Sequence, residues 1–597
     1  MTAHLDKIVI VLYLLFLVGM GAAFRSFNRN IDDYIRGGAQ GTWWLVGTSI
    51  LMSGISAFTF TGNSGAAYEA GFTPLIIYIA QVFAYLVAAI WLAPWFRQTR
   101  VLTGPEIFRT RFGIEVEQFI SYFSFIVGTV TASLALWGVA TFCSVIFEIP
   151  IEWTILGLGL VTLAYSTAGG RWGVMATDFV QSLVLFPITI LVAVLSLHAV
   201  GGISGFVDKL QGPELHEAYQ LIKEPGAFPA GKYSVNWIFA TFLIMFFQGL
   251  SFSNAPKYFS VKDGREARYA ALMAGVLMGI GGLIWFIPPM VGRMLFSEEI
   301  ASAALSNPHE AAYAVVARNL LPNGLLGVMV IAMFSATMSS LDTGLNGAAG
   351  IVVRNIIPPI RDLFGREELS HKGQLYAGKI TTLCLGVSII GMAFYLSQQK
   401  DLGLFDAFFT LTTVIGLPTA VPAIVAVFIR PLPRWSYFVV TGAGALVSLT
   451  SVIQETVFDI PWTVQERTFW VFGVGTVACL ATIPFYWNPR FTSERFRERV
   501  DAFYRQMHTP VDFAKEIVES RDFTQLQMIG FFSIGLGVFI CFLVLLPNPW
   551  AGRLSILFVG GFSIGIGSLL RFAAYRLQQR ERRLRAGLKP DAPKTDS

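Results

Sequence analysis

Two apolar runs of this 597-residue chain are interrupted by glycine and polar residues. They contain SGISAFTFTGNSG at residues 53–65 and QGLSFSNAP at residues 248–256. An interrupted helix leaves backbone carbonyls without partners, and such carbonyls can hold a cation at membrane depth. Close packing of helices through glycine would explain either run alone. Together the two runs predict a pair of broken helices that bind an ion.

A third apolar run carries hydroxyl residues and a carboxylate. Its segment SATMSSLDTGLNG places Ser339, Asp342 and Thr343 on one helical face, three and four residues apart, with Ser340 beside them. Polar groups inside a membrane are costly and are usually functional. This face is therefore a candidate for a functional site.

Asp178 and Asp342 are expected at overlapping depths in the membrane. At about 1.5 Å of rise per residue, Asp178 lies roughly 10 Å from Arg171, and Asp342 lies roughly 18 Å from Arg354. Two buried carboxylates need a cation, a proton or hydrogen bonds from hydroxyl groups. The sequence favours one shared cation-linked site, and structural hydrogen bonding remains an alternative for each carboxylate.

The elements that position these residues are membrane helices. The chain is 54% hydrophobic and 14% charged, whereas soluble domains carry about 25% charged residues. This composition excludes a soluble enzyme and indicates an all-α polytopic membrane protein. Since a span needs about 20 apolar residues, we expect about fifteen spans, at 8–24, 43–67, 72–95, 119–146, 153–168, 174–200, 235–257, 267–292, 323–355, 377–397, 402–429, 436–457, 468–487, 527–546 and 553–574.

The basic residues orient these spans. With the N-terminus outside and the C-terminus in the cytoplasm, 34 of the 43 Lys and Arg residues fall in cytoplasmic segments. Lys257 is counted among them, in a loop that runs to Arg268. The basic tail at 576–589 is expected to face anionic lipid rather than nucleic acid. A multi-pass protein of the inner (plasma) membrane, acting as a monomer, is therefore expected.

Three motifs carry a resemblance to a known family: GTSILMSGISAFTFTGNSG at 47–65, AGGRWGVMATDFVQ at 168–181 and FSATMSSLDTGLN at 334–346. Over roughly residues 5–460 the chain resembles the sodium/solute symporter family, which has the leucine-transporter fold. The two broken runs lie five spans apart, as an inverted repeat requires, because the second copy must cross in the opposite sense.

The resemblance implies a transporter core at 43–429. Its repeats of five helices each are expected at 43–200 and 235–429. The flanking segments follow in chain order: an extra span and loop at 1–42, two spans at 430–487, a charged, loop-like cytoplasmic linker at 488–526, and two spans with a basic tail at 527–597.

The resemblance also implies sodium ligands. The principal sodium would be held by the carbonyls of Met52, Ile55 and Ala336 and by the hydroxyls of Ser339 and Ser340. A second cation would lie at Asp178, with Ser339, Asp342 and Thr343 contributing oxygens. Asp342 departs from the family pattern, which has a small or hydroxyl residue at that position.

The solute positions depart further from the sugar carriers of the family. Where those carriers use polar residues, this chain has Gly54, Phe58, Thr59, Ile244, Phe252 and Phe409. Each sugar hydroxyl buried without a partner costs about 1–3 kcal/mol, so a hexose pocket is disfavoured. The aromatic gate of the sugar carriers matches Phe247. The polar candidates for contact with the solute are Ser56, Thr59, Gln248, Ser251 and Thr412, with Gln248 preferred.

These residues predict sodium-coupled symport of a small organic solute by alternating access. No GxSxG, HExxH or phosphate-loop motif occurs in a supporting context, so no enzyme is expected. A transporter-like solute sensor and a proton-coupled symporter are the alternatives.

Overall fold

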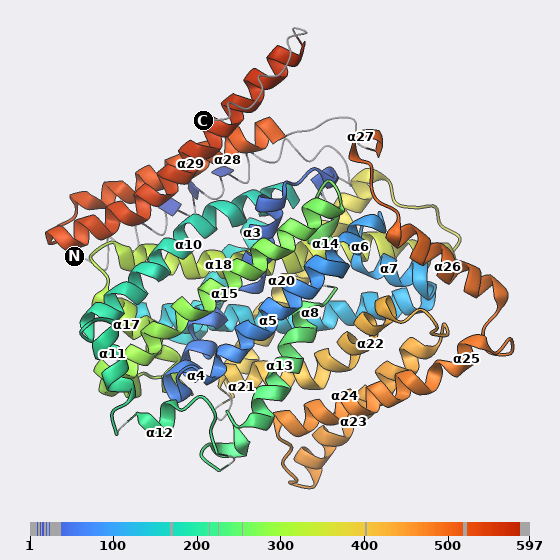
Figure 1. Cartoon of the computed structure of the whole chain (residues 1–597), viewed down its shortest axis with the longest axis horizontal. Coiled ribbons are helices and arrows are strands. Elements are labelled where there is room, and N and C mark those ends of the chain that lie inside the picture. Colours follow the sequence, from blue (N-terminus) through green and yellow to red (C-terminus); the bar gives the residue numbers. More distant parts are fainter. Residues whose placement is uncertain are drawn as a thin grey trace, which may run out of the picture.

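The computed structural model describes residues 37–166, 171–213, 215–224, 226–252, 255–399, 403–516 and 522–585, with residues 9, 12, 13, 15, 16, 19, 20 and 23. These residues form helices and turns, and no β-strand occurs among them (Figure 1). The expected first span at 8–24 lies mostly outside the described residues.

The part that corresponds to the expected transporter core begins with a broken helix. Its first half contains α3 (Trp43–Gly54), η3 (Ala57–Phe60), α4 (Gly62–Ala70), α5 (Ile76–Val87), α6 (Ala93–Gln98), α7 (Gly104–Arg111), α8 (Ile114–Phe147), α9 (Ile151–Ser166) and α10 (Arg171–Ala199). The short helices α11 (Gly202–Leu210) and α12 (His216–Tyr219) then connect the two halves.

The second half of the core also begins with an interrupted helix. It contains α13 (Val235–Gly249), α14 (Ala255–Phe259), α15 (Gly264–Leu295), α16 (Ser297–Ala301), η7 (Pro308–Ala311), α17 (Ala312–Leu320), α18 (Leu325–Ile351), α19 (Ile357–Leu363), α20 (His371–Ser397), α21 (Leu404–Leu411) and α22 (Leu417–Phe428). The remaining helices are α23 (Ser436–Val457), α24 (Val464–Thr482), α25 (Pro484–Trp487), α26 (Glu494–His508), α27 (Phe513–Glu516), α28 (Asp522–Cys541) and α29 (Trp550–Arg585).

Eleven helices among the described residues are long and apolar enough to cross a membrane, or twelve if the bent pair α3–α4 counts as one span. Two shorter apolar helices, Ile151–Leu163 and Val235–Gly249, coincide with further expected spans. The chain is therefore a multi-pass, all-helical membrane protein. Fifteen spans and the five-plus-five repeat stay predictions.

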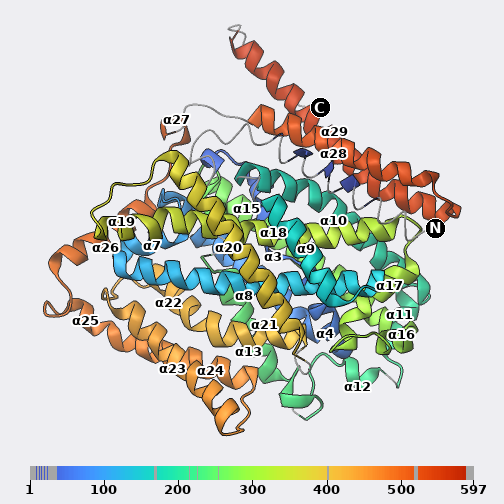
Figure 2. The same cartoon turned by 180° about the vertical axis from the view of Figure 1, so that it is seen from behind.

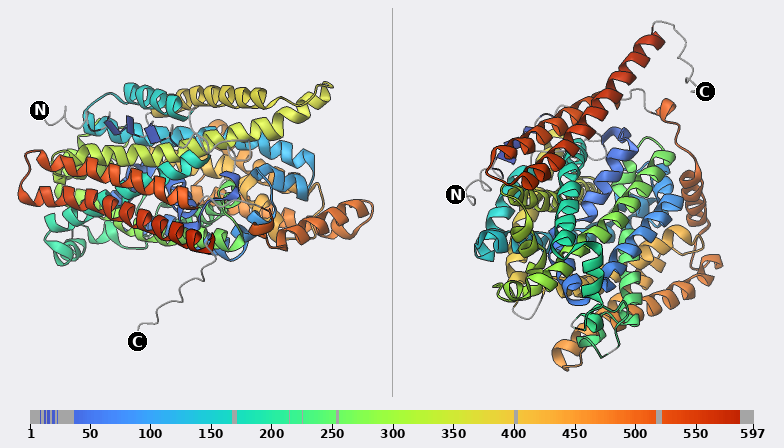
Figure 3. Two further views of the ribbon diagram at one scale, coloured as in Figure 1. Left: turned by 90° about the horizontal axis from the view of Figure 1, so that it is seen from above. Right: turned by 60° about the vertical axis from the view of Figure 1, so that its left-hand side comes forward.

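Helices α3, α10, α15 and α18 pack against one another and form the centre of the bundle. Helices α8, α9 and α20 contact each other on the face seen in Figure 2. The pair α23 and α24 lies along one edge, and the pair α28 and α29 lies along the opposite edge. The C-terminal end of α29 projects beyond the bundle (Figure 3). Because the outer pairs expose large apolar side chains such as Val477 and Phe558, these faces suit contact with lipid.

The charged segment at 488–526 contains a helix where a loop was expected. Helix α26 buries Phe496, Val500 and Phe503 along one side and packs against α6 and α7. Its Tyr504 hydroxyl donates hydrogen bonds to the carbonyls of Ala426 (3.2 Å) and Val427 (3.1 Å), at the end of α22. This amphipathic helix therefore links α22 to the short helices around residue 100.

Candidate sodium and solute site

The first interruption separates α3 from α4, whose axes differ by 58°. Helix α3 ends at Gly54, and Ile55 and Ser56 have extended backbones. Glycine favours helices weakly, and the Ser56 side chain competes for backbone donors by accepting a hydrogen bond from Phe58 N (3.3 Å). This local sequence stops the helix and leaves the carbonyls of Ser53 and Ile55 free for other partners.

Helix α18 supplies those partners. The Ser340 hydroxyl lies 2.8 Å from the Ile55 carbonyl oxygen, 3.2 Å from that of Ser53 and 3.4 Å from that of Ala336. Thr337, one turn earlier, accepts a hydrogen bond from Ala57 N at 3.0 Å. Three of the five expected ligands of the principal sodium, namely Ile55, Ala336 and Ser340, therefore lie together.

The other two expected ligands are buried in the same region of the bundle. Met52 lies in α3, and Ser339 lies in α18 next to Ser340. The Ser339 hydroxyl has no hydrogen-bond partner among the described residues. A buried hydroxyl without a partner is costly, and a sodium ion would satisfy its oxygen. Hydroxyl and carbonyl oxygens are hard ligands, so the residues present fit sodium.

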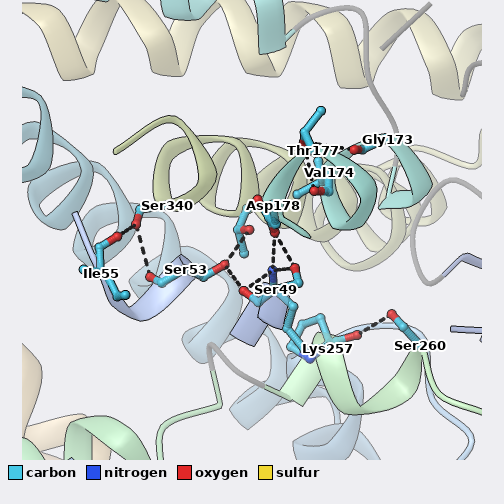
Figure 4. A network of polar contacts seen from close by, with 12 residues as sticks. Ser49, Ser53, Ile55, Gly173, Val174, Thr177, Asp178, Lys257, Ser260 and Ser340 are labelled. Carbon is cyan, nitrogen blue, oxygen red and sulfur yellow. Dashed lines mark hydrogen bonds and ion pairs between the residues drawn. The ribbon is translucent and has the colours of Figure 1, made fainter. Parts of the chain in front are cut away.

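Asp178 of α10 has a counter-charge that sequence reasoning missed. Lys257 of α14 lies 3.5 Å from Asp178 Oδ2, and both side chains are almost completely buried. Ser49 of α3 joins them, because its hydroxyl accepts from Lys257 Nζ at 2.5 Å and donates to Asp178 Oδ2 (Figure 4). The assignment of Lys257 to a cytoplasmic loop is therefore wrong, since this side chain lies inside the protein.

Thr343 and Asp342 differ in what they contact. The Thr343 hydroxyl lies 3.1 Å from the Ser53 hydroxyl, which in turn donates to the Ser49 carbonyl at 2.9 Å. Thr343 therefore contacts this network through Ser53 of α3. Asp342 is buried in α18, and a cation site shared by Asp342 and Asp178 stays a prediction.

A cavity of about 530 Å³ lies beside these residues. Six of the seven expected solute contacts line it: Ser56, Phe58, Thr59, Gln248, Ser251 and Thr412. Phe247 is the exception. Its ring packs against Phe472 of α24, with ring centroids 4.7 Å apart, and its expected role as the solute gate stays a prediction.

The cavity wall is uncharged. No Asp, Glu, Lys, Arg or His is found among the described residues that line it. Apolar side chains, including Phe58, Phe252 and Ile244, cover most of the wall. Asn63 adds a polar group that sequence reasoning missed. It donates to the Tyr78 hydroxyl at 3.0 Å, and its own buried oxygen has no partner among the described residues.

The end of α4 remote from α3 is held by residues of α15 and η7. His309 Nδ1 lies 2.8 Å from Glu69 Oε1, and Arg293 donates to the Glu69 carbonyl at 2.7 Å. Glu310 accepts a hydrogen bond from Leu404 N (2.6 Å) at the start of α21. Burial raises the pKa of Glu310, which lies in η7 outside the spanning helices, to about 8. These contacts join α4, the loop before α17 and α21.

Some of the missed residues left a signal in the sequence. Thr337 precedes Ser340 by three residues, so helical spacing could have placed both on the face that meets the first break. The pairing of Lys257 with Asp178 left no signal in the sequence, because the two residues are 79 positions apart.

A helical membrane protein in which a broken helix meets a hydroxyl-bearing helix beside an uncharged cavity has the architecture of a secondary transporter. The chain belongs to the sodium:solute symporter family, whose model matches residues 34–449. Members of this family are transporters rather than enzymes, and they couple a small-molecule solute to sodium.

Similar proteins agree with this assignment. The chain is 24% identical to sodium/glucose cotransporter 1 of Ovis aries, covering 76% of this chain and 72% of that protein. It is 25% identical to sodium/myo-inositol cotransporter 2 of Homo sapiens, covering 76% and 71%.

Two solved structures share the fold. A Na+-coupled sialic acid symporter in a substrate-bound outward-open state matches with a TM-score of 0.67 at 18% identity, over 80% of this chain and 97% of that one. Mhp1, a nucleobase-cation-symport-1 family transporter in a closed conformation, matches with a TM-score of 0.52 at 12% identity, over 79% and 99%.

Proposed function

We propose that this protein uses sodium bound between α3 and α18 to drive uptake of an uncharged, largely apolar solute by alternating access. The convergence of the Ile55 and Ala336 carbonyls with the Ser340 hydroxyl carries the sodium part of the proposal. The unpartnered hydroxyl of Ser339 supplies a further oxygen. One sodium ion moving through about 100 mV gains roughly 2.3 kcal/mol, which is enough to concentrate a neutral solute.

The uncharged cavity supports the solute class. A charged solute would lose its hydration without gaining an opposite charge from the wall, and that loss is costly. A sugar would leave several hydroxyls facing phenylalanine. A solute with a few polar groups suits Gln248, Ser56 and Thr59, with its apolar part against Phe58 and Phe252.

The two ends of the cavity support an inward-facing conformation. Phe58 packs on Phe408, with ring centroids 4.6 Å apart, beneath the contacts that hold α4. The wall continues in the other direction to Thr103, Phe252 and Ile351. In the orientation set by the basic residues, that end faces the cytoplasm. Solute would enter from the outside after α4 moves away from α21.

A thermal-stability screen of the purified protein tests the proposal. Uncharged solutes, sugars, amino acids and carboxylates are added in sodium chloride or in choline chloride. We expect stabilisation by an uncharged, mostly apolar compound only when sodium is present, and sodium-dependent uptake of that compound into proteoliposomes. Equal stabilisation in both salts would contradict sodium coupling, and a preference for sugars or carboxylates would contradict the solute class.

A further inference from the structure

The oxygens around the Lys257 ammonium are the kind that would surround a sodium ion. Lys257 Nζ lies 3.1 Å from the Ser49 carbonyl oxygen, 2.5 Å from the Ser49 hydroxyl and 3.5 Å from Asp178 Oδ2. A carbonyl, a hydroxyl and a carboxylate are hard ligands for a cation. They also match the three N–H donors of an ammonium group. The side chain therefore places a tethered positive charge where a free cation would otherwise bind.

Burial makes this position selective for a cation. Lys257 is fully buried, and Asp178 is 1% exposed at its side chain. A buried carboxylate without a counter-charge is strongly unfavourable, so a positive group must stay close to Asp178. The lysine satisfies that requirement without taking up an ion from solution.

The ion pair is continuous with the proposed sodium site. Ser53 donates to the Ser49 carbonyl at 2.9 Å, and the Ser53 carbonyl accepts from Ser340 at 3.2 Å. Figure 4 shows this chain of contacts from Lys257 to Ile55. The pair therefore lies next to the proposed sodium site, and it joins α14 of the second broken helix to α3 of the first.

We infer that Lys257 supplies the cation at Asp178, so that this symporter binds one sodium ion rather than two. The inference rests on the proposed sodium site between α3 and α18. It replaces the expected second cation at Asp178 with a residue of the chain itself. Lys257 is then a determinant of ion stoichiometry.

Equilibrium binding of radioactive sodium to the purified protein tests this inference. We expect one sodium per wild-type chain. Lys257→Met removes the ammonium and keeps a side chain of similar length, so Asp178 should then take a second sodium and the stoichiometry should rise to two. The double variant Lys257→Met with Asp178→Asn has neither charge and should return to one.

Several results would overturn the inference. Two sodium ions in the wild type, falling to one in the double variant, would show that Asp178 binds sodium despite the lysine. A stoichiometry of one in folded Lys257→Met would show that Asp178 does not attract an ion. If Lys257→Met does not fold, the wild type and the double variant still decide between one ion and two. The absence of sodium binding to the wild type would reject the proposed sodium site itself.

Discussion

At the scale of single residues, the site depends on hydroxyl groups that meet carbonyls released by a helix break. Ser340 reaches the carbonyls of Ser53, Ile55 and Ala336, whereas the hydroxyl of Ser339 is buried without a partner. Both oxygens can coordinate sodium without adding a fixed charge. In the proposed function, this lets sodium bind and leave within one transport cycle.

We expect Ser339→Ala and Ser340→Ala each to weaken sodium binding about 10- to 100-fold. A contact between a polar group and a charge is worth about 1.5–3 kcal/mol, and every 1.4 kcal/mol is about tenfold in affinity. Sodium titration of thermal stability measures the effect. Ser196→Ala is the control, because Ser196 is buried in α10 and donates only to the Val192 carbonyl. Wild-type sodium affinity in the double Ser339/Ser340 variant would remove these hydroxyls from the site.

Gln248→Ala tests the solute contact. Gln248 lines the cavity at the end of α13, and truncation would leave a polar group of the bound solute unpaired at about 1–3 kcal/mol. Solute affinity should fall about tenfold or more, with sodium affinity nearly unchanged. Both are measured on the same purified variant, with Gln374→Ala at the start of α20 as the control. If sodium binding, solute binding and stability all fall together, Gln248 instead has a structural role and stabilises the helix break.

At the scale of elements, helix ends and glycine contacts determine which helices approach closely. The hairpin of α28 and α29 is one such close contact. A Cβ added at Gly560 would lie 2.7 Å from the Gly537 carbonyl and 2.5 Å from Cys541 Sγ, whereas a Cβ at Gly561 would have nothing within 4 Å. Two neighbouring glycines therefore face opposite environments, one the partner helix and the other open space.

We expect Gly560→Ala to destabilise the protein by about 1–3 kcal/mol, because extra volume in a tight contact must displace the backbone. Gly561→Ala should be neutral or slightly stabilising, since alanine favours helix by about 1 kcal/mol over glycine. Melting temperatures of the two variants in the same detergent provide the comparison. Equal melting temperatures would show that α28 and α29 can move apart at Gly560 without loss of stability.

At the scale of the whole molecule, the two ends of the cavity differ. In the proposed inward-facing conformation, one end is closed by Phe58 against Phe408 and by the hydrogen bond from Leu404 N, at the start of α21, to Glu310 of η7. The other is bordered by the loop before α7, the second break and the end of α18. Helix α26 links the short helices at that end to α22. In the proposed transport cycle, movement of α4 and α21 is coordinated with movement at the opposite end.

The closed end is expected to loosen as the pH rises. Burial raises the pKa of Glu310 from its ordinary value near 4.5 to about 8, so the closed arrangement keeps a proton that a hydrated carboxyl would release. The stability that this proton gives to the closed arrangement is fully present below about pH 4.5 and is lost as the pH rises through 8. Hydrogen exchange of α4 and α21, corrected for intrinsic rates, should accelerate over this range.

Glu310→Gln is the matched variant for this prediction. The amide keeps an oxygen that can accept from Leu404 N, and it has no proton to lose. Exchange in the variant should stay slow across the same pH range. The same acceleration in Glu310→Gln as in the wild type would assign the pH dependence to another group.

The sequence by itself determined the class of protein and the position of the first helix break. Apolar runs of spanning length can satisfy their backbone groups only as helices, and Gly54 with Ser56 ends α3 through purely local preferences. The hydroxyl spacing in α18 is likewise local. For these reasons the family, the proximity of Ile55, Ala336 and Ser340, and six of the residues that line the cavity could be predicted, whereas sodium binding by these oxygens stays a prediction.

Only the tertiary structure decided which distant side chains meet. Lys257 follows a break at the end of an apolar run. The sequence alone therefore fitted a cytoplasmic loop as well as a buried position. Its contact with Asp178 depends on how α14 packs against α3 and on how α3 packs against α10. Phe247 was expected at the solute, but the added helix α24 places Phe472 against it. Such contacts depend on helix rotation and on distances between remote segments, and neither is encoded in local composition.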